Sequence, residues 1–148
     1  MAEVRVSAAK RADLPSITRL YKALYMGDEH MRFYRSRVRL DGLKSGQKIF
    51  IAKAKGEAAG FLWLIWYEHM RHKGVACIEE LFVKPGFRQR GLGRALVSNA
   101  MRFSKKKGML VVFVVTGRHM IRAQRFYKKA GFHHMTRGCF VRNLNGNA

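Results

Sequence analysis

The sequence predicts an α/β (α+β) fold in which about four helices flank a mixed, mostly antiparallel central sheet. Three successive segments are rich in Ile, Val, Phe and Trp and are separated only by short polar stretches, which indicates an antiparallel meander. A helical segment then stands between two β-like segments, and this order implies a parallel strand pair. The length of 148 residues suits one domain, which we expect to span 1–148.

The first part of the chain predicts one strand and two helices. Residues 4–7 alternate apolar and polar side chains, as in a short strand. Asp13 can cap a helix over 14–24, where Pro15 stands in the first turn. A second helix is expected over 28–43, and one of its faces carries a row of arginines. These are Arg32, Arg35, Arg37 and Arg39.

The meander and the elements after it follow from hydrophobic periodicity. Trp63 and Trp66 are three residues apart, so they fall on opposite faces of their strand. The segment 109–115 is a continuous β-branched run, which is typical of a strand covered on both faces. The expected strands are 48–55, 58–67, 75–84 and 109–115. The expected helices are 92–107 and 122–130, ended by Gly108 and Gly131, and a last strand or hairpin is expected at 132–141.

The charge balance is the most unusual feature of the composition. The chain has 30 Lys and Arg against 9 Asp and Glu, a formal net charge of +21. A net positive charge of this size raises the local concentration of polyanions around the protein, and it far exceeds the charge that solubility requires. We therefore expect an anionic partner, and nucleic acid is one candidate.

The sequence shows no sign of a membrane span, a secretion signal, a disulfide or a metal site. The longest apolar runs fall far short of the roughly 20 residues that cross a bilayer, and the N-terminus lacks an apolar signal core. Cys77 and Cys139 stand in apolar or β-prone stretches without CxxC spacing, so we expect buried free thiols and a cytoplasmic location. The six histidines lack the spacing of metal ligands.

A loop rich in glycine and arginine carries the clearest chemical signal. It spans residues 83–94, between a strand and a helix, with the sequence VKPGFRQRGLGR. Its glycines let the backbone turn tightly near a ligand, and the N–H groups at the start of the following helix favour phosphate oxygens. The loop lacks the Lys-Ser/Thr end of a nucleotide-hydrolase P-loop and the third glycine of a dinucleotide fingerprint. We interpret it as a pyrophosphate cradle.

The motifs around this loop resemble those of the GNAT superfamily of acetyl-CoA-dependent N-acetyltransferases. The loop matches that family's acyl-CoA signature, RxxGxG, from Arg88 to Gly93, and residues 123–132 match its closing helix, AxxFYxxxGF. The resemblance is specific over about 75–132 and implies that the parallel strand pair is splayed. Met120 is a departure, because many members carry there an Asn that helps hold the pantetheine.

The resemblance also implies how acetyl-CoA is held as the co-substrate. Main-chain groups of the splayed strand would contact the pantetheine arm, and the N–H groups of the loop would hold the pyrophosphate while arginine side chains add charge. Core packing of the strand side chains is compatible with this role, because the contacts use the backbone. The strand residues are Leu81, Phe82 and Val83. The loop residues are Arg88, Gln89, Arg90, Gly91, Leu92, Gly93 and Arg94.

Three residues are candidates for the catalytic steps, which need a base for the amine and an acid for the departing thiolate. By the resemblance, Tyr127 is the acid, and Glu79 and Glu80 match the acidic pair of polyamine-type members. We assign Glu79 as the base, acting through water, and Glu80 as a contact of the substrate ammonium. Strand alternation predicts that the two carboxylates lie on opposite faces. The alternatives are aromatic packing for Tyr127, a surface ion pair for Glu80, and His119 as the base.

The sequence therefore predicts an enzyme that acetylates a primary amine by direct attack in a ternary complex. No Cys or Ser stands where it would support a covalent acetyl-enzyme. The large positive charge leaves two alternatives open: the amine is carried by a polyanion, such as aminoacyl-tRNA or a ribosomal protein, or the chain is a non-catalytic nucleic-acid-binding module on the same fold. A homodimer is a further candidate assembly, and no motif specifies the acceptor amine.

Overall fold

The computed structural model describes residues 4–25, 46–69 and 72–135. The expected second helix at 28–43, with its arginines, lies outside these ranges, as does Cys139. Most of the expected last strand at 132–141 also lies outside them. No helix of the described ranges is long and apolar enough to cross a membrane.

The chain divides into two compact units, Met1–Thr116 and Gly117–Ala148. The first unit is built on a five-stranded sheet. Its strands are β1 (Val4–Ala8), β2 (Gln47–Ala54), β3 (Glu57–His69), β4 (His72–Val83) and β5 (Val111–Val114). They lie side by side in sequence order, antiparallel except for the parallel pair β4 and β5. The expected meander and the expected parallel pair are therefore confirmed.

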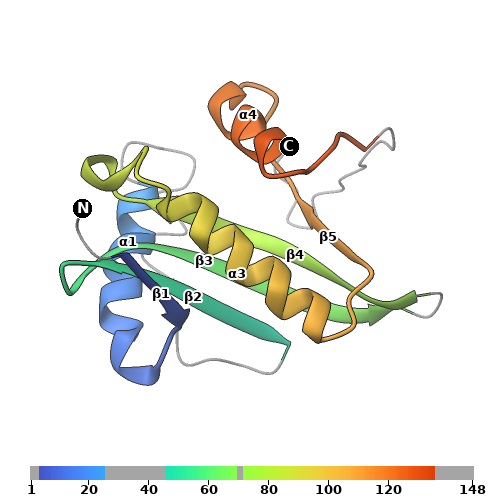
Figure 1. Cartoon of the computed structure of the whole chain (residues 1–148), viewed down its shortest axis with the longest axis horizontal. Helices are drawn as coiled ribbons and strands as arrows, with labels where there is room; N and C mark the ends of the chain where they lie inside the picture. The colour runs from blue at the N-terminus through green and yellow to red at the C-terminus, as the bar shows by residue number, and fades with distance from the viewer. Residues whose placement is uncertain (1–3, 26–45, 70–71, 136–148) are drawn as a thin grey trace, which may run out of the picture. The chain divides into compact units, whose positions relative to one another are not determined.

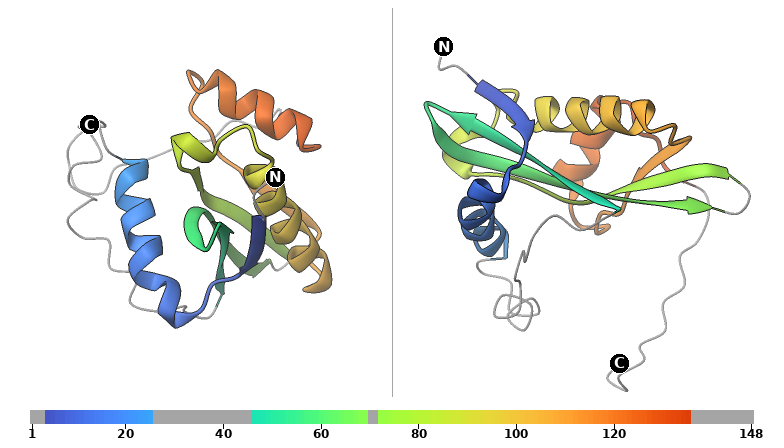
Figure 2. Two further views of the ribbon diagram at one scale, coloured as in Figure 1. Left: turned by 60° about the vertical axis from the view of Figure 1, so that its left-hand side comes forward. Right: turned by 90° about the horizontal axis from the view of Figure 1, so that it is seen from below.

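Two helices cover opposite faces of the sheet, α1 (Leu14–Leu24) on one face and α3 (Leu92–Lys106) on the other (Figure 1, Figure 2). Ile17 and Leu20 of α1 pack in a buried cluster with Phe61 of β3. On the other face, Phe103 of α3 packs against Phe50 of β2, with ring centroids 6.0 Å apart. Each fully buried apolar side chain, such as Ile17 or Phe61, contributes roughly 1.5 to 3 kcal/mol, so packing on both faces holds the sheet between the helices.

The two tryptophans of β3 lie on opposite faces, as their spacing predicts. Trp63 lies on the α1 face, with its ring centroid 6.3 Å from that of Tyr21, and its indole N–H donates to Gln47 Oε1 at 2.9 Å. Trp66 lies on the α3 face, with its ring centroid 5.3 Å from that of Phe103. Each face of the sheet therefore has its own tryptophan.

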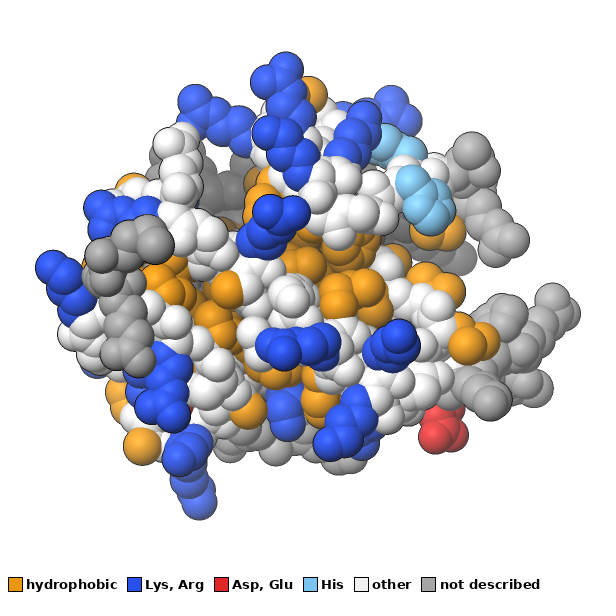
Figure 3. All heavy atoms as spheres, viewed as in Figure 1, with side chains coloured by type: hydrophobic (Ala, Val, Ile, Leu, Met, Phe, Trp, Pro, Cys, Tyr) orange, Lys and Arg blue, Asp and Glu red, His pale blue; other side chains and the backbone are white. Residues whose placement is uncertain are grey.

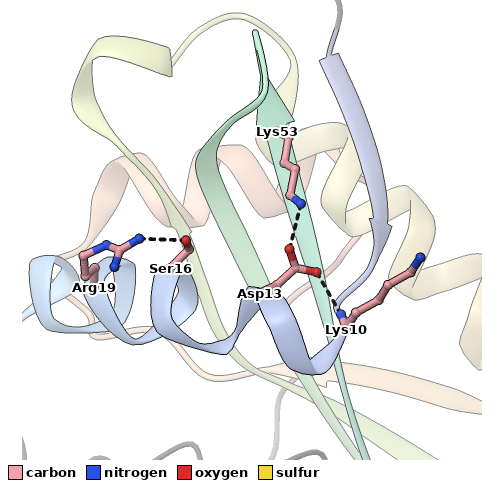
Figure 4. A network of polar contacts seen from close by, with 5 residues as sticks. All are labelled: Lys10, Asp13, Ser16, Arg19 and Lys53. Carbon is pink, nitrogen blue, oxygen red and sulfur yellow. Dashed lines mark hydrogen bonds and ion pairs between the residues drawn. The ribbon is translucent and has the colours of Figure 1, made fainter.

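The start of α1 differs in detail from the sequence expectation. Asp13 holds the N-cap position and Pro15 stands in the first turn, but the Asp13 side chain does not cap the helix. Its carboxylate accepts a hydrogen bond from the Lys10 backbone N–H at 2.9 Å and pairs with Lys53 Nζ at 2.7 Å (Figure 4). The Lys53 contact first, and then the Lys10 hydrogen bond, hold the pKa of Asp13 below its usual value. Asp13 therefore ties the start of α1 to β2.

β5 is less covered than its β-branched run predicts. Within the described sheet it is the edge strand, next to β4 alone. Val111 is 50% exposed, and Leu110 and Val115 on either side of the strand are 60% and 80% exposed. Fewer side chains pack on an edge strand than on a central one, so the expectation of cover on both faces is wrong for Val111.

The second unit contains α4 (Ile121–Lys129), which confirms the expected last helix to within a residue at each end. Tyr127 is buried in α4, and its ring packs against those of Phe126 and Phe132, with centroids 5.1 and 5.5 Å away. Gly131 follows with φ of 92°, a left-handed conformation that commonly ends helices.

Candidate active site

A β-bulge interrupts β4 at the acidic pair. In the ladder with β3, Trp63 pairs with Glu80, but the next residue, Leu64, pairs with Ile78. Glu79 is therefore the extra residue, and both glutamates stand opposite Trp63. A bulge bends the strand and re-aims its side chains, so the regular alternation of faces does not hold across this pair.

Both carboxylates consequently lie on the α1 face, and the expectation of opposite faces is wrong. Glu80 Oε1 accepts a hydrogen bond from the hydroxyl of Tyr25, the C-cap residue of α1. Glu79 lies beside Cys77, with Oε2 4.0 Å from Sγ. The negative charges of both glutamates act on Tyr21 of α1. Alternation fails here because a single inserted residue reverses every face assignment that follows it.

The two glutamates differ in their surroundings. Glu79 is exposed, whereas Glu80 is half-buried. Burial raises the pKa of Glu80 to about 7, because removing a carboxylate from water disfavours its charged form. A carboxyl group with this pKa exchanges its proton readily near neutral pH. Glu80 therefore has the acid–base properties that a general base needs.

Aromatic side chains stand beside the Glu80 carboxylate. The ring centroid of Tyr21 lies 5.0 Å from that of Tyr25 and 6.3 Å from that of Trp63. Burial first, and then the charges of Glu80 and Glu79, raise the pKa of Tyr21 to about 12, so its phenol is neutral at physiological pH. We call Tyr21, Tyr25, Trp63, Glu79 and Glu80 the acidic-aromatic corner. Carboxylates beside aromatic faces attract an ammonium group.

Cys77, next to this corner, is a buried free thiol, as expected. Burial, and then the charge of Glu79, raise the pKa of its thiol to about 11. The thiol is therefore protonated at physiological pH and a poor nucleophile. Across the described ranges, no group of three or more His, Cys, Asp or Glu side chains lies where it could hold a metal ion.

The parallel ladder between β4 and β5 ends just before the acidic pair. Its pairs run from Val75 with Val111 to Ile78 with Val114. Residues 80–83 keep their partners in β3, but no described residue of β5 pairs with them. The strand pair is therefore splayed at this point, as the resemblance implies. The segment that loses its β5 partner includes the strand residues expected to contact the pantetheine.

The loop after β4 has the backbone of an anion site. A short 3-10 turn, Pro85–Phe87, leads to Gln89 with φ of 59° and to Gly91 with φ of 82°. Gly91 is the N-cap of α3, and no side chain caps this helix. The first N–H groups of α3, from Leu92 onward, are therefore left for a ligand or water to satisfy. This is the arrangement in which helix N-termini hold phosphate oxygens.

The side chains of Arg88 and Arg90 contact residues of the loop or of the end of β4. Arg88 donates from Nε to the Val83 carbonyl oxygen at 2.9 Å, and its guanidinium lies 5.9 Å from the Phe82 ring centroid. Arg90 lies at the same distance, 5.9 Å, from the Phe87 ring centroid. Both side chains can shape the loop as well as add charge to it. The loop residues exposed to solvent are Arg88, Gln89, Arg90, Gly91 and Arg94, whereas Gly93 is half-buried and Leu92 is buried.

Comparison with known proteins identifies the family. The model of the Acetyltransferase (GNAT) family matches residues 14–132, which is most of the chain. The chain belongs to the GNAT acetyltransferase family. An uncharacterized N-acetyltransferase of Archaeoglobus fulgidus is 32% identical to this GNAT protein over 131 residues, which cover 84% of the chain and 89% of the relative. The protein is therefore an acetyltransferase, and acetyl-CoA is its co-substrate.

Two further proteins are similar to this GNAT protein over different lengths. An uncharacterized N-acetyltransferase of Methanocaldococcus jannaschii is 36% identical over 85 residues, which cover 56% of the chain but only 38% of that relative. The aminoglycoside N-acetyltransferase AAC(6')-Iy, solved with a bisubstrate analogue of CoA, has a TM-score of 0.79 at 24% identity. That match covers 96% of this chain and 99% of the solved one, and at this identity it shows the shared fold.

The closing-helix motif of the GNAT family lies in the second unit. Tyr127 is its buried tyrosine, and Met120 at the start of α4 is 48% exposed. The backbone N–H of Met120 donates to the Gly117 carbonyl, and Gln124 Nε2 donates to the same carbonyl, each at 3.0 Å. His119 is exposed in this turn. Gln124 thus orders the turn at which many GNAT members carry an Asn.

Two residues of the acidic-aromatic corner, Tyr21 and Tyr25, were not among the predicted site residues. Their spacing of four residues places them on one face of α1, which is a signal that the sequence contains. Aromatic residues on the apolar side of a helix most often belong to the core, and Tyr21 is indeed buried there. Only the contact of Tyr25 with Glu80, 55 residues along the chain, distinguishes the pair from ordinary packing.

Proposed function

We propose that this GNAT protein transfers an acetyl group from acetyl-CoA to a primary amine by direct attack in a ternary complex, with Glu80 as the general base. The observation that carries the proposal is the half-buried Glu80 carboxylate, with a pKa of about 7, beside the Tyr25 hydroxyl. Family membership supplies the reaction class, and the acidic-aromatic corner supplies groups suited to an amine.

The first step is deprotonation of the acceptor. An ammonium group has no free lone pair, so it must lose a proton before its nitrogen can attack a carbonyl carbon. Glu80 takes this proton, directly or through one water. The rings of Tyr21 and Trp63 and the charge of Glu79 attract the ammonium group. The sequence favours Glu79 as the base and Glu80 as the contact of the ammonium, so the two glutamates have the opposite roles here. The assignment that the sequence favours stays a prediction.

The second step forms the amide and releases the thiol. The amine nitrogen bonds to the carbonyl carbon, the C–S bond breaks, and Tyr127 donates its phenol proton to the departing thiolate. The nitrogen carries an extra proton after it has bonded to the carbon, and it loses this proton to solvent. Solvent also restores the proton of Tyr127 and removes the proton held by Glu80. The backbone of residues 81–83 and the N–H groups of residues 89–94 hold the acetyl-CoA. The Arg88 N–H already donates to the Pro85 carbonyl at 3.2 Å. The protonated state of the Cys77 thiol supports a route without an acetyl-cysteine.

A direct test separates acetyl-CoA binding from catalysis. Calorimetry is expected to give a micromolar Kd for acetyl-CoA. Mass spectrometry with isotope-labelled acetyl-CoA and a library of amines is expected to find a labelled acetamide. Absence of binding by acetyl-CoA or any other acyl-CoA at millimolar concentration would contradict the proposal.

Tyr127→Phe is expected to lower kcat on the order of tenfold while the Kd of acetyl-CoA stays near that of the wild type. The loss is modest because a thiolate is a good leaving group, with a thiol pKa of about 8.5. Steady-state kinetics and calorimetry measure the two quantities. Phe keeps the ring that packs against Phe126 and Phe132, so a thermal melt serves as the folding control. An unchanged kcat would make Tyr127 a packing side chain.

Tyr25→Phe is expected to move the acid limb of the pH profile of kcat/KM upward by about one pH unit. The Tyr25 hydroxyl donates to the carboxylate and so stabilises its ionised form. Without this hydrogen bond, the pKa of Glu80 rises further above about 7, and the ionised base is populated only at higher pH. A profile that keeps the limb of the wild type, with a lower rate throughout, would assign Tyr25 to packing.

A second candidate acceptor is an amine carried by a polyanion, and the net charge of +21 favours it. A basic protein repels a free polyamine at long range and attracts a polyanion, and added salt screens both effects. As salt increases, kcat/KM should fall for an amine carried by a polyanion and rise for a free polyamine. The sign of this salt dependence discriminates between the two acceptor classes.

We also propose that residues 1–148 act as one catalytic domain in the cytoplasm. The family match spans residues of both compact units. The free thiol of Cys77 is suited to a reducing compartment. Light scattering of the purified protein distinguishes a monomer from a homodimer.

A further inference from the structure

α3 carries a basic face on its solvent side. Its apolar side packs on the sheet, where Leu96 and Ala100 are fully buried. No acidic residue is present in the helix. The basic residues that reach solvent from α3 and its C-cap are Arg94, Arg102, Lys105, Lys106 and Lys107.

These charges have no acidic partner among the described residues. The ion pairs of the described ranges join Lys53 to Asp13 and Lys84 to Glu57, and neither involves α3. After Glu80 the sequence contains no further Asp or Glu. Figure 3 views the molecule from the α3 side and shows blue basic side chains over this region, whereas red acidic ones occur only near the margin. The positive charge of this face is therefore available to an external anion.

The C-terminal end of α3 adds aromatic rings to this charge. Phe103 and Trp66 are half-buried, with ring centroids 5.3 Å apart. Lys48 of β2 places Nζ 4.7 Å from the Phe103 centroid, and Lys107 places Nζ 5.3 Å from the Trp66 centroid. Such cation–π contacts pre-order long side chains, which lowers the entropy cost of binding. We call Lys48, Trp66, Arg102, Phe103, Lys105, Lys106 and Lys107 the α3 basic-aromatic end.

Binding of acetyl-CoA does not explain the basic residues at the C-terminal end of α3. The pyrophosphate cradle lies at the N-terminus of α3, and a helix of 15 residues is about 22 Å long. The phosphates of one CoA bound at the cradle are therefore far from Lys105, Lys106 and Lys107. Lysines in the last turn also complement the helix dipole. That explanation does not extend to Lys48, which comes from β2.

We propose that the α3 basic-aromatic end binds single-stranded nucleic acid on a surface separate from the acetyl-transfer site. The lysines and Arg102 contact successive phosphates, and unstacked bases pack on Trp66 and Phe103, as on the aromatic platforms of single-strand binders. The acidic-aromatic corner lies on the opposite face of the sheet, so a bound strand leaves that corner free. The proposal does not depend on which amine is acetylated.

The first test measures the salt dependence of binding with the full-length protein. Fluorescence anisotropy with a labelled oligouridine is expected to show binding at low salt that weakens as salt rises. The triple variant Lys105→Gln/Lys106→Gln/Lys107→Gln removes up to three phosphate contacts. At about 0.7 per contact, it is expected to reduce the slope of log affinity against log salt by about 2. Affinity at low salt is expected to fall at least tenfold.

A matched variant removes the same charge from the other side of the molecule. Arg11, Arg19 and Lys22 are exposed in or beside α1. The variant Arg11→Gln/Arg19→Gln/Lys22→Gln is expected to bind oligouridine nearly as the wild type does. Circular dichroism confirms that both variants are folded. Equal losses in the two variants, or no binding at low salt, would overturn the proposal.

Tryptophan fluorescence locates the contact. The chain has 2 tryptophans, one on each face of the sheet. Trp63→Phe keeps Trp66, whose emission oligouridine is expected to quench. Trp66→Phe keeps Trp63, whose emission is expected to stay unchanged. Saturating CoA is expected to leave the quenching in place. Quenching of Trp63, no quenching of Trp66, or complete displacement by CoA would overturn the proposal.

Discussion

Replacing Glu80 by Gln is expected to lower kcat/KM for the acceptor amine by roughly a hundredfold or more at neutral pH. The amide has nearly the shape of the carboxyl group but cannot accept the proton of the ammonium. Its oxygen still accepts a hydrogen bond from Tyr25, so the contact that joins α1 to β4 is retained. Kinetics at saturating acetyl-CoA measure the loss, and a thermal melt confirms the fold.

The pH profile gives this prediction a second readout. Glu80 accepts a proton only when it is ionised, and its pKa is raised to about 7. In the wild type, kcat/KM should therefore fall as the pH decreases below about 7. This limb should disappear in Glu80→Gln. If the acid limb persists in Glu80→Gln, it reports the ionisation of a group other than Glu80.

Glu79→Gln is the matched control, because it removes the same charge from the neighbouring residue. Glu79 is exposed, so we expect a KM for the amine that rises only severalfold and an acid limb that stays. The reverse outcome, with Glu80→Gln nearly silent and Glu79→Gln inactive, would restore the roles that the sequence favours.

Gly91→Asp is expected to raise the KM for acetyl-CoA by roughly a hundredfold. Gly91 is the N-cap of α3 with φ of +82°, and a Cβ added there meets no atom within 4 Å. The new side chain therefore projects into the space where the pyrophosphate is expected. Two unit negative charges about 5 Å apart repel by about 3 kcal/mol at an effective dielectric of about 20.

Gly91→Asn separates charge from backbone strain. Asn is nearly isosteric with Asp and, like Asp, tolerates left-handed φ better than most residues. We expect a KM that rises only severalfold and a melting temperature close to that of Gly91→Asp. Equal KM values for the two variants would point to the backbone rather than to charge. Wild-type KM values in both would remove the loop from the acetyl-CoA site.

Local sequence patterns determined the elements that carry the site. The apolar, β-prone segments of the meander form β2, β3 and β4, and Gly108 and Gly131, both with positive φ, end α3 and α4 as expected. The loop was also predictable from local sequence, because Gly91 has a left-handed backbone conformation that glycine adopts without strain. Each of these features depends on residues only a few positions apart, so the sequence alone contains the necessary information.

The tertiary structure decided how the acidic pair is arranged. The bulge at Glu79 depends on the register of β4 against β3, and burial of both faces sets that register rather than any local motif. The pKa of Glu80 depends on burial produced by the fold, and its hydrogen bond comes from Tyr25, 55 residues away. The sequence therefore determined which carboxylates are candidates. Only the packing of α1 against the sheet determined which of them is withdrawn from water.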